Sequence, residues 1–317
     1  MRLAITGMGV VSAAGIGKDA MMEALHRTDV CLAPSRFLAT RRQVPVGEVP
    51  FDNEALKARL SLPAGTTCSR TSLLGMLAAR EALQQAGLAP GSRVAFISST
   101  TVGGMDLSEQ FYDDFRHDPR KGRLRLIVHH DSADSTQAIA RYLGLNGFCT
   151  TISTACSSSA NAVLLGARLL RTGWCDAVVV GGTDALCKFT LNGFSSLMIL
   201  DQAPCRPFDE TRAGLNLGEG AAYLVLQRPQ DVQKQALAYL CGAANANDAH
   251  HQTATSAEGR GAQLAMRKAL QSAGLEPSDI GYINAHGTGT PNKDASESAA
   301  MAAVFGSQVP PFSSTKP

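Results

Sequence analysis

One cysteine of this sequence has the surroundings of a nucleophile. The segment TISTACSSSA runs from Thr151 to Ala160, so a short buried strand ends just before Cys156 and a helix of small residues begins just after it. Free amides and the helix dipole at a helix N-terminus stabilise a thiolate, the reactive form of cysteine. The pattern mirrors the nucleophile elbow of hydrolases, with sulfur in place of oxygen. A buried structural cysteine, our interpretation of the other seven, explains the local pattern equally well.

A histidine later in the chain is placed where α/β folds keep their sites. A predicted strand over Ile280–Ala285 delivers His286 into a turn of sequence HGTGT, in which Thr288 and Thr290 add hydroxyl groups. Ligands of α/β sheets bind beyond the carboxyl ends of the strands. A lone histidine is more often structural, but the demanding glycine–threonine turn beside this one favours a functional role.

Other candidate sites have plainer explanations. The Gly7-Met8-Gly9 segment lacks the third glycine of a dinucleotide fingerprint, because Ser12 stands at that position. The tandem pairs His129-His130 and His250-His251 would point to opposite faces of a strand, so we interpret them as surface or structural residues. The cysteines form no CxxC pair, and we expect no metal site.

Composition and charge exclude several classes of function. A chain of 317 residues with 44% hydrophobic and 18% charged residues is typical of a soluble globular protein with a large core. A net charge of +2 is too balanced to indicate nucleic-acid binding. No run approaches the roughly 18 apolar residues of a membrane span, and glycines interrupt the first residues where a signal peptide would be apolar. We therefore expect a cytoplasmic protein.

The chain alternates apolar runs with helical patterns, and these elements must position the two candidate residues. Predicted strands are Leu3–Ile5, Arg93–Ser98, Phe148–Ile152, Asp176–Val180, Ala221–Leu226, Leu237–Cys241, Ile280–Ala285 and Val309–Ser313. Predicted helices are Ser69–Gly87, Ser135–Gly144, Ser157–Thr172, Ser256–Ala273 and Asp294–Phe305. Apolar strands separated by helices predict a mostly parallel sheet covered on both faces.

Two further expectations concern the long segments between these elements. Ala221–Leu226 and Leu237–Cys241 resemble a pair of neighbouring strands, with a change of structural unit near Ala236. The polar stretch Gly103–Asp134 reads as an excursion on the surface, and its basic residues lie between Arg116 and Arg125. Such residues usually form a solvated face. The sharper hypothesis is that they form a docking patch for an acidic carrier protein.

Together these motifs resemble the β-ketoacyl-acyl-carrier-protein synthases, the condensing enzymes of fatty-acid and polyketide synthesis. The resemblance runs the length of the chain. The motifs are ITGMGVVS from Ile5, TACSSS from Thr154, RPFD from Arg206, LGEGAA from Leu217, HGTGT from His286 and SSTK from Ser313. A full set in this order is far more specific than any single motif.

The resemblance implies an α/β fold of the thiolase type, layered α/β/α/β/α, with two related βαβ halves. Residues 1–240 would form the half with the nucleophile, and residues 241–317 the start of an incomplete second half. It also implies a homodimer, or a heterodimer with a related synthase subunit such as a chain-length factor. Acyl carrier protein would be the other partner. The phosphopantetheine arm would be attached to the carrier protein, so we expect no cofactor bound to this chain.

The resemblance further implies roles for individual residues. Cys156 would accept the acyl group from a carrier thioester. His286 would donate a hydrogen bond to the thioester oxygen as the malonyl carrier loses carbon dioxide. Lys316 would support the site electrostatically. The residues that would contact substrate are Thr288 and Thr290, at the phosphopantetheine arm, and Phe194, in a loop bordering the acyl tunnel. Asp294 and Glu297 match the acidic positions that help to order the site.

The sequence departs from the family at its end. In the family, the lysine motif leads within a few residues to a second active-site histidine and then to the last strands, whereas this sequence ends at Pro317. Loss of one oxyanion donor typically costs about 10²–10³ in rate. We therefore expect little condensing activity from this polypeptide alone.

Several other functions stay open at this stage. The chain could be a non-catalytic subunit or fragment that dimerises with another ketosynthase, although Cys156 favours the enzyme. A thiolase acting on coenzyme A esters is disfavoured by the HGTGT motif, and a hydrolase by the absence of Gly-x-Ser-x-Gly. Within the family, the sequence also resembles bacterial synthases that build aryl polyenes or similar polyunsaturated chains.

Overall fold

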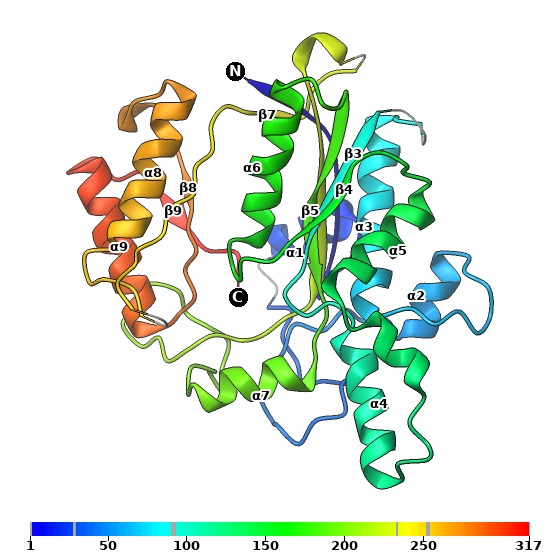
Figure 1. The fold of residues 1–317 in the computed structure, drawn as a ribbon. Helices are drawn as coiled ribbons and strands as arrows, with labels where there is room; N and C mark the ends of the chain where they lie inside the picture. The colour runs from blue at the N-terminus through cyan, green and yellow to red at the C-terminus, as the bar shows by residue number, and fades with distance from the viewer. Residues whose placement is uncertain (1, 28–29, 90–92, 233, 252–253, 317) are drawn as a thin grey trace.

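A mixed sheet forms the centre of the molecule. The computed structural model describes residues 2–27, 30–89, 93–232, 234–251 and 254–316. Within these residues the sheet has seven strands in the order β2-β1-β6-β5-β3-β4, with β7 also paired to β1 (Figure 1). The strands are β1 (Leu3–Ser12), β2 (Gly15–Ile16), β3 (Val94–Ser99), β4 (Cys149–Ile152), β5 (Ala177–Asp184), β6 (Gly220–Gln227) and β7 (Ala238–Leu240).

The prediction of a mostly parallel sheet is wrong. Strand β3 runs parallel to β4 and β5, but β6 lies antiparallel between β1 and β5. A run of apolar residues reports burial on both faces and does not report strand direction. The expected pairing of Ala221–Leu226 with Leu237–Cys241 is also wrong, because β6 and β7 each pair with β1.

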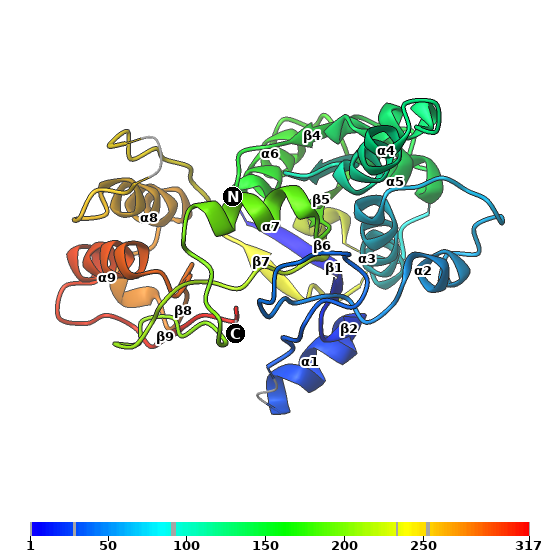
Figure 2. The same cartoon turned by 90° about the horizontal axis from the view of Figure 1, so that it is seen from below.

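Helices cover both faces of this sheet. Helices α3 (Arg70–Ala86) and α5 (Ser132–Leu143) pack on one face, and α6 (Ser158–Arg171) packs on the other (Figures 1 and 2). The prediction of α3 is confirmed at both ends. The Ser69 side chain accepts from the amide of Ser72, and Gly87 ends the helix at φ 68°. That left-handed conformation strains residues other than glycine.

The two glycines of the Gly-x-Gly in β1 allow helix α3 to pack closely against the strand. A Cβ atom on Gly9 would lie 2.0 Å from the carbonyl oxygen of Ala78, and one on Gly7 would lie 2.1 Å from that of Ala82. Helix α3 therefore approaches the backbone of β1 more closely than any side chain would allow. This contact accounts for both glycines without a dinucleotide.

Four helices were not predicted from the sequence. They are α1 (Lys18–Arg27), α2 (Asn53–Arg59), α4 (Met105–His117) and α7 (Lys188–Ser196). The expected surface excursion over Gly103–Asp134 is in fact α4 followed by the 3₁₀ helix η1 (Leu124–His129). Only Leu107 is buried in α4, and Gly104 supplies no side-chain cap. The helix is therefore rich in exposed polar side chains, which resemble a loop in the sequence.

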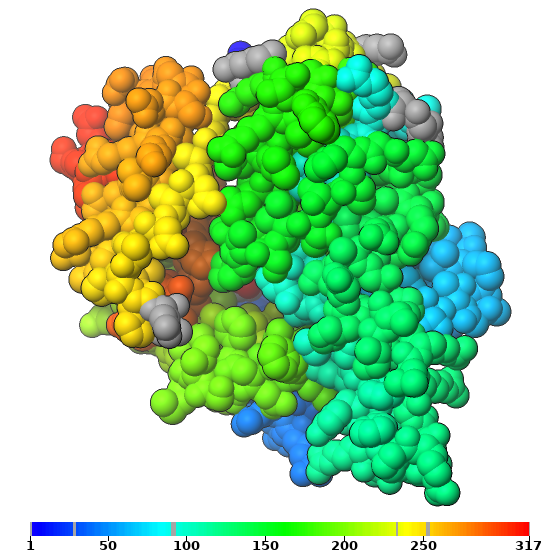
Figure 3. Space-filling view, in the orientation of Figure 1, coloured from blue at the N-terminus to red at the C-terminus, as the bar shows by residue number. Residues whose placement is uncertain are grey.

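A second, smaller unit lies beyond α6. It contains α8 (Arg260–Ala273), α9 (Pro291–Phe305) and a parallel pair of strands, β8 (Ile283–Asn284) and β9 (Phe312–Ser313). In Figures 1 and 2 this unit stands on the side of α6 away from the large sheet. Figure 3 shows a hollow between the two parts on the face drawn. Among the described residues, no helix has the length and apolarity needed to cross a bilayer.

Candidate active site

The turn between β4 and α6 carries Cys156. Its backbone reverses at Ala155, whose φ of 53° is left-handed. The side chain of Ser158 closes the turn, donating to the carbonyl of Ala155 at 2.6 Å and accepting from the amide of Thr154 at 2.8 Å. Helix α6 begins two residues after Cys156, and the cysteine side chain is exposed. The predicted strand–turn–helix geometry is confirmed, with the thiol close to a helix N-terminus.

Cys156 opens into a cavity of about 800 Å³ at the carboxyl ends of β1, β3 and β5. Its apolar lining includes Val102, Leu186 and Leu217. Phe194 lines the same cavity, although it lies on helix α7 and not in the loop expected from the sequence. A cavity of this size with an apolar lining suits an extended hydrocarbon chain better than a charged metabolite.

Two carboxylates of α9 hold the loop that follows β8. Glu297 accepts from the amides of His286 and Gly287, at 2.7 and 2.9 Å. The carboxylate of Asp294, whose residue is 1% exposed, accepts from the amides of Thr288 and Gly289, at 2.9 and 3.1 Å. Buried backbone amides need such acceptors, and these two fix the direction of the loop.

The two threonines of this loop face inward. Thr288 and Thr290 are each 6% exposed, and their hydroxyl groups lie 2.8 Å apart within hydrogen-bonding distance. The same carboxylate of Asp294 also accepts from the amide of Phe208 at 2.8 Å. The loop is therefore tied to the 201–216 segment as well as to α9.

Lys316 contacts the loop that carries the histidine. Its ammonium group donates to the carbonyl oxygen of His286. Partial burial lowers the pKa of His286, and the positive charge of Lys316 lowers it further. Partial burial likewise lowers the pKa of Lys316, whereas the negative charge of Glu297 raises it. Lys316 therefore acts on the predicted histidine through a hydrogen bond to its carbonyl and through its charge.

Lys316 itself lines a second cavity of about 380 Å³. Leu217 and Gly218 line both this cavity and the one that contains Cys156. The segment that carries these two residues therefore separates the thiol side of the site from the lysine side.

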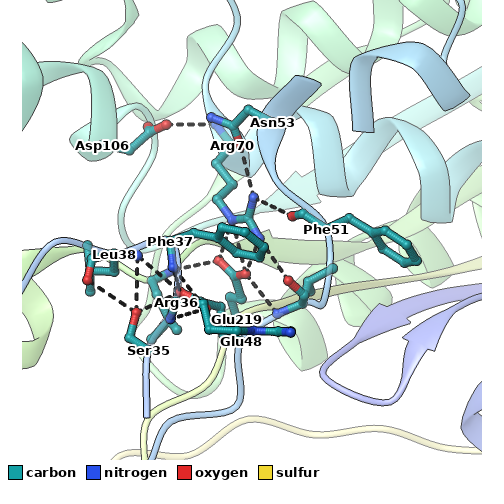
Figure 4. A network of polar contacts seen from close by, with 12 residues as sticks. Ser35, Arg36, Phe37, Leu38, Glu48, Phe51, Asn53, Arg70, Asp106 and Glu219 are labelled. Atoms are coloured by element: carbon teal, nitrogen blue, oxygen red, sulfur yellow. Dashed lines mark hydrogen bonds and ion pairs between the residues drawn. The ribbon is translucent and has the colours of Figure 1, made fainter. Parts of the chain in front are cut away.

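Sequence reasoning missed the buried ion pair behind this segment. Arg70 donates from Nε to both carboxylate oxygens of Glu219, at 3.0 and 2.8 Å, and its Nη1 donates to the carbonyl of Phe51 and the side chain of Asn53 (Figure 4). Glu219 also accepts from the amide of Leu186 at 3.0 Å. The pair therefore supports two walls of the main cavity. The only sequence signal for it is the glutamate inside the LGEGAA motif.

Asn161 is a second residue that sequence reasoning missed. Its amide donates to the hydroxyl of Thr154 at 2.8 Å and accepts from Asn245 at 2.9 Å. It therefore links the turn of Cys156 to the start of the smaller unit. Nothing in the local sequence pattern distinguishes it.

The first histidine pair is held by contacts within the fold. His129 pairs with Asp134 at 2.8 Å, and the ring of His130 lies 2.9 Å from the hydroxyl of Ser108. These contacts join η1 to α4 and α5, which fits the structural interpretation. No group of three or more His, Cys, Asp or Glu side chains is arranged to bind a metal in the part of the chain described.

The fold is an α/β fold of the thiolase type with a cysteine at a strand–turn–helix junction, and the comparisons with known proteins agree on the fold. The chain matches the family models "Beta-ketoacyl synthase, N-terminal domain" over residues 1–232 and "Beta-ketoacyl synthase, C-terminal domain" over residues 237–317. The chain belongs to the β-ketoacyl synthase family.

Individual relatives are similar over nearly the whole chain. Nodulation protein E of Rhizobium meliloti is 32% identical, over 96% of this chain and 77% of the relative. The 3-oxoacyl-[acyl-carrier-protein] synthase 2 of Staphylococcus aureus strain MRSA252 is 30% identical, over the same shares. The solved structure of the ishigamide ketosynthase/chain length factor has a TM-score of 0.92 and 30% identity, over 99% of this chain and 80% of that one. The expected thiolase-like fold is confirmed.

Proposed function

We propose that this protein forms carbon–carbon bonds by decarboxylative Claisen condensation in fatty-acid or polyketide chain elongation, with Cys156 as the acyl acceptor. The observation that carries the proposal is the placement of Cys156. The thiol stands at a tight turn before a helix and opens into an apolar cavity of about 800 Å³. Membership of the β-ketoacyl synthase family supports the same chemistry.

The first half-reaction would load the acyl chain. The thiolate of Cys156 attacks the carbonyl carbon of the acyl thioester, the new sulfur–carbon bond forms, the bond to the carrier sulfur breaks, and the carrier leaves as a thiolate that takes a proton from water. The chain then extends into the apolar cavity. Thr288 and Thr290 lie in the loop beside His286, and we assign them to contact with the phosphopantetheine arm.

The second half-reaction would extend the chain. The malonyl thioester loses carbon dioxide, and the resulting enolate carbon attacks the acyl group on Cys156, which leaves as a thiolate. Negative charge develops on the thioester oxygen, so a donor aimed at that oxygen lowers the barrier. We assign this donor to His286. Its lowered pKa keeps the imidazole neutral, so it donates without adding a cation beside the nucleophile. Lys316 contributes the fixed positive charge.

The proposed donor of both substrates is an acyl carrier protein, as the name of the Staphylococcus aureus relative indicates for that enzyme. Five basic residues are exposed from the last turn of α4 to the start of η1, namely Arg116, Arg120, Lys121, Arg123 and Arg125. Such a patch suits an acidic carrier. Salt should therefore slow acyl transfer from the carrier while leaving transfer from a small neutral thioester unchanged. We place the protein in the cytoplasm, where this chemistry has its substrates.

A second candidate function is that of a partner subunit for another ketosynthase. The likeness to the ishigamide ketosynthase/chain length factor favours it, because that name sets a chain length factor beside the ketosynthase. Both candidates allow a dimer. They differ in whether Cys156 is acylated. The aryl polyene type of substrate stays a prediction from the sequence.

Acyl transfer to the protein separates the two candidates. The protein is incubated with an octanoyl-carrier thioester, and its intact mass is measured over time. The enzyme proposal predicts a mass increase of one octanoyl group, absent from a Cys156→Ala variant. A chain that stays unmodified, while an unrelated ketosynthase is acylated under the same conditions, would support the partner subunit instead.

A further inference from the structure

Asp184 is a carboxylate in the wall of the Cys156 cavity. It is the last residue of β5, and the loop after β3 surrounds it with donors. Its Oδ1 atom accepts from the hydroxyl of Thr100 at 2.6 Å, from the amide of Thr101 at 2.8 Å and from the amide of Val102 at 3.3 Å. Its Oδ2 atom accepts from the hydroxyl of Thr101 at 2.7 Å.

These donors explain how a carboxylate can line an apolar cavity. An ionised carboxyl group out of water is costly unless its lone pairs are bonded. Asp184 has four bonds from one short loop, so both of its oxygens are engaged by the protein. It is therefore an anchor for the loop and not a ligand for the substrate.

The anchored loop forms part of the cavity wall. Val102 is 7% exposed and lines the cavity that Cys156 lines. The 3₁₀ helix η1 also packs closely against the end of this loop, since a Cβ on Gly104 would lie 1.9 Å from the carbonyl oxygen of His129. The loop is therefore held at two places, by η1 at Gly104 and by the hydrogen bonds to Asp184. The position of Val102 depends on the hydrogen bonds to Asp184.

We propose that Asp184 is a positioning residue that determines which acyl-chain lengths Cys156 accepts, by holding the Thr100–Val102 loop against the cavity. The inference rests on the proposed function. Removing the carboxylate leaves the buried hydroxyl of Thr100 without its acceptor and frees Thr101, so the loop shifts to satisfy the hydroxyl. The wall at Val102 then yields to a longer chain. Asp184 does not touch the thiol, so the nucleophile itself is unaffected.

The test compares two acyl donors on each variant. Acylation of Cys156 by butanoyl- and dodecanoyl-N-acetylcysteamine is followed by intact mass, and iodoacetamide reports the intrinsic accessibility of the thiol. In Asp184→Ala, the dodecanoyl-to-butanoyl rate ratio should rise about tenfold or more, the scale at which apolar pockets discriminate methylene groups. Thr101→Val removes only the hydroxyl bond and should move the ratio in the same direction by less. Iodoacetamide rates should stay unchanged.

Asp176→Ala is the matched control, since this carboxylate precedes the same strand at its opposite end and pairs with Arg228. It should leave the ratio unchanged. If Asp184→Ala does not fold, Thr101→Val carries the test alone. A folded variant with the wild-type ratio overturns the inference and leaves the proposed function intact. A wild-type protein that neither thioester acylates overturns the proposed function and the inference with it.

Discussion

The ion pair between Arg70 and Glu219 is the clearest place to test how the cavity walls are held. The side chain of Glu219 is 0% exposed and that of Arg70 is 9% exposed. Replacing Arg70 by methionine keeps most of the volume and removes every donor of the Arg70 side chain (Figure 4). The buried carboxylate of Glu219 would then accept hydrogen bonds only from the amides of Val49 and Leu186, at 2.9 and 3.0 Å. No positive charge would remain beside it.

Removing one partner of a buried ion pair costs about 3–5 kcal/mol, because the other charge remains out of water and uncompensated. Arg70→Met should therefore lower the free energy of unfolding in urea by that amount. The double variant Arg70→Met/Glu219→Gln should lose less, since it leaves no buried charge and the glutamine oxygen can still accept from Leu186. Circular dichroism at increasing urea concentration measures all of these.

Arg93→Met is the matched control. Arg93 is 63% exposed on its side chain and stands 3.9 Å from Asp176, so its loss should cost about 1 kcal/mol or less. The reasoning is refuted if Arg70→Met is no more destabilising than Arg93→Met. It is also refuted if the double variant is less stable than Arg70→Met alone, because an isolated charge would then not be the cause.

Two further predictions concern the histidine loop and the close packing of β1. The pKa of His286 should lie below 6.5 in an NMR titration, and Lys316→Met should raise it because a repelling cation is lost; an unchanged midpoint would contradict the electrostatic role of the lysine. The unfolded chain binds a proton at His286 more tightly than the folded protein does. Lowering the pH from 6.5 toward the pKa of the folded protein should therefore reduce the free energy of unfolding. Gly9→Ala should destabilise the fold by about 1–3 kcal/mol, because its Cβ would meet the carbonyl of Ala78 at 2.0 Å. Gly281→Ala, where a Cβ meets nothing within 4 Å, should leave the melting temperature nearly unchanged, and equal effects of both substitutions would contradict the packing argument.

Local signals made parts of this fold predictable from the sequence. Both ends of helix α3 are indicated in the sequence, by Ser69 at its start and Gly87 at its end. The turn at Cys156 is indicated by a strand, small residues and a helix in succession. Helix α4 was missed because it buries a single residue and lacks a side-chain cap. The direction of β6 was missed because burial on both faces constrains composition and leaves strand direction open.

In the candidate site, too, some residues were predictable from the sequence and others were not. Cys156 and His286 stand out because each follows a strand and enters an unusual turn. The residues that hold the walls do not stand out, since their partners are remote in the sequence. Asp184 accepts from a loop more than 80 residues away, and Arg70 reaches Glu219 across 149 residues. A hydrogen bond of this kind leaves no periodicity and no spacing to read.

The proposed condensation requires that Cys156 is the acyl-accepting nucleophile. Cys149 provides an internal comparison, because it is also solvent-accessible and begins β4, the strand that leads to the same turn, while partial desolvation raises the pKa of its thiol. The decisive measurement is labelling with an epoxide inhibitor of the cerulenin type, followed by peptide mass mapping of the adduct. The epoxide should modify Cys156 and leave Cys149 unlabelled at the same dose. Labelling of Cys149 instead, or equal labelling of both, would contradict the proposed role of Cys156.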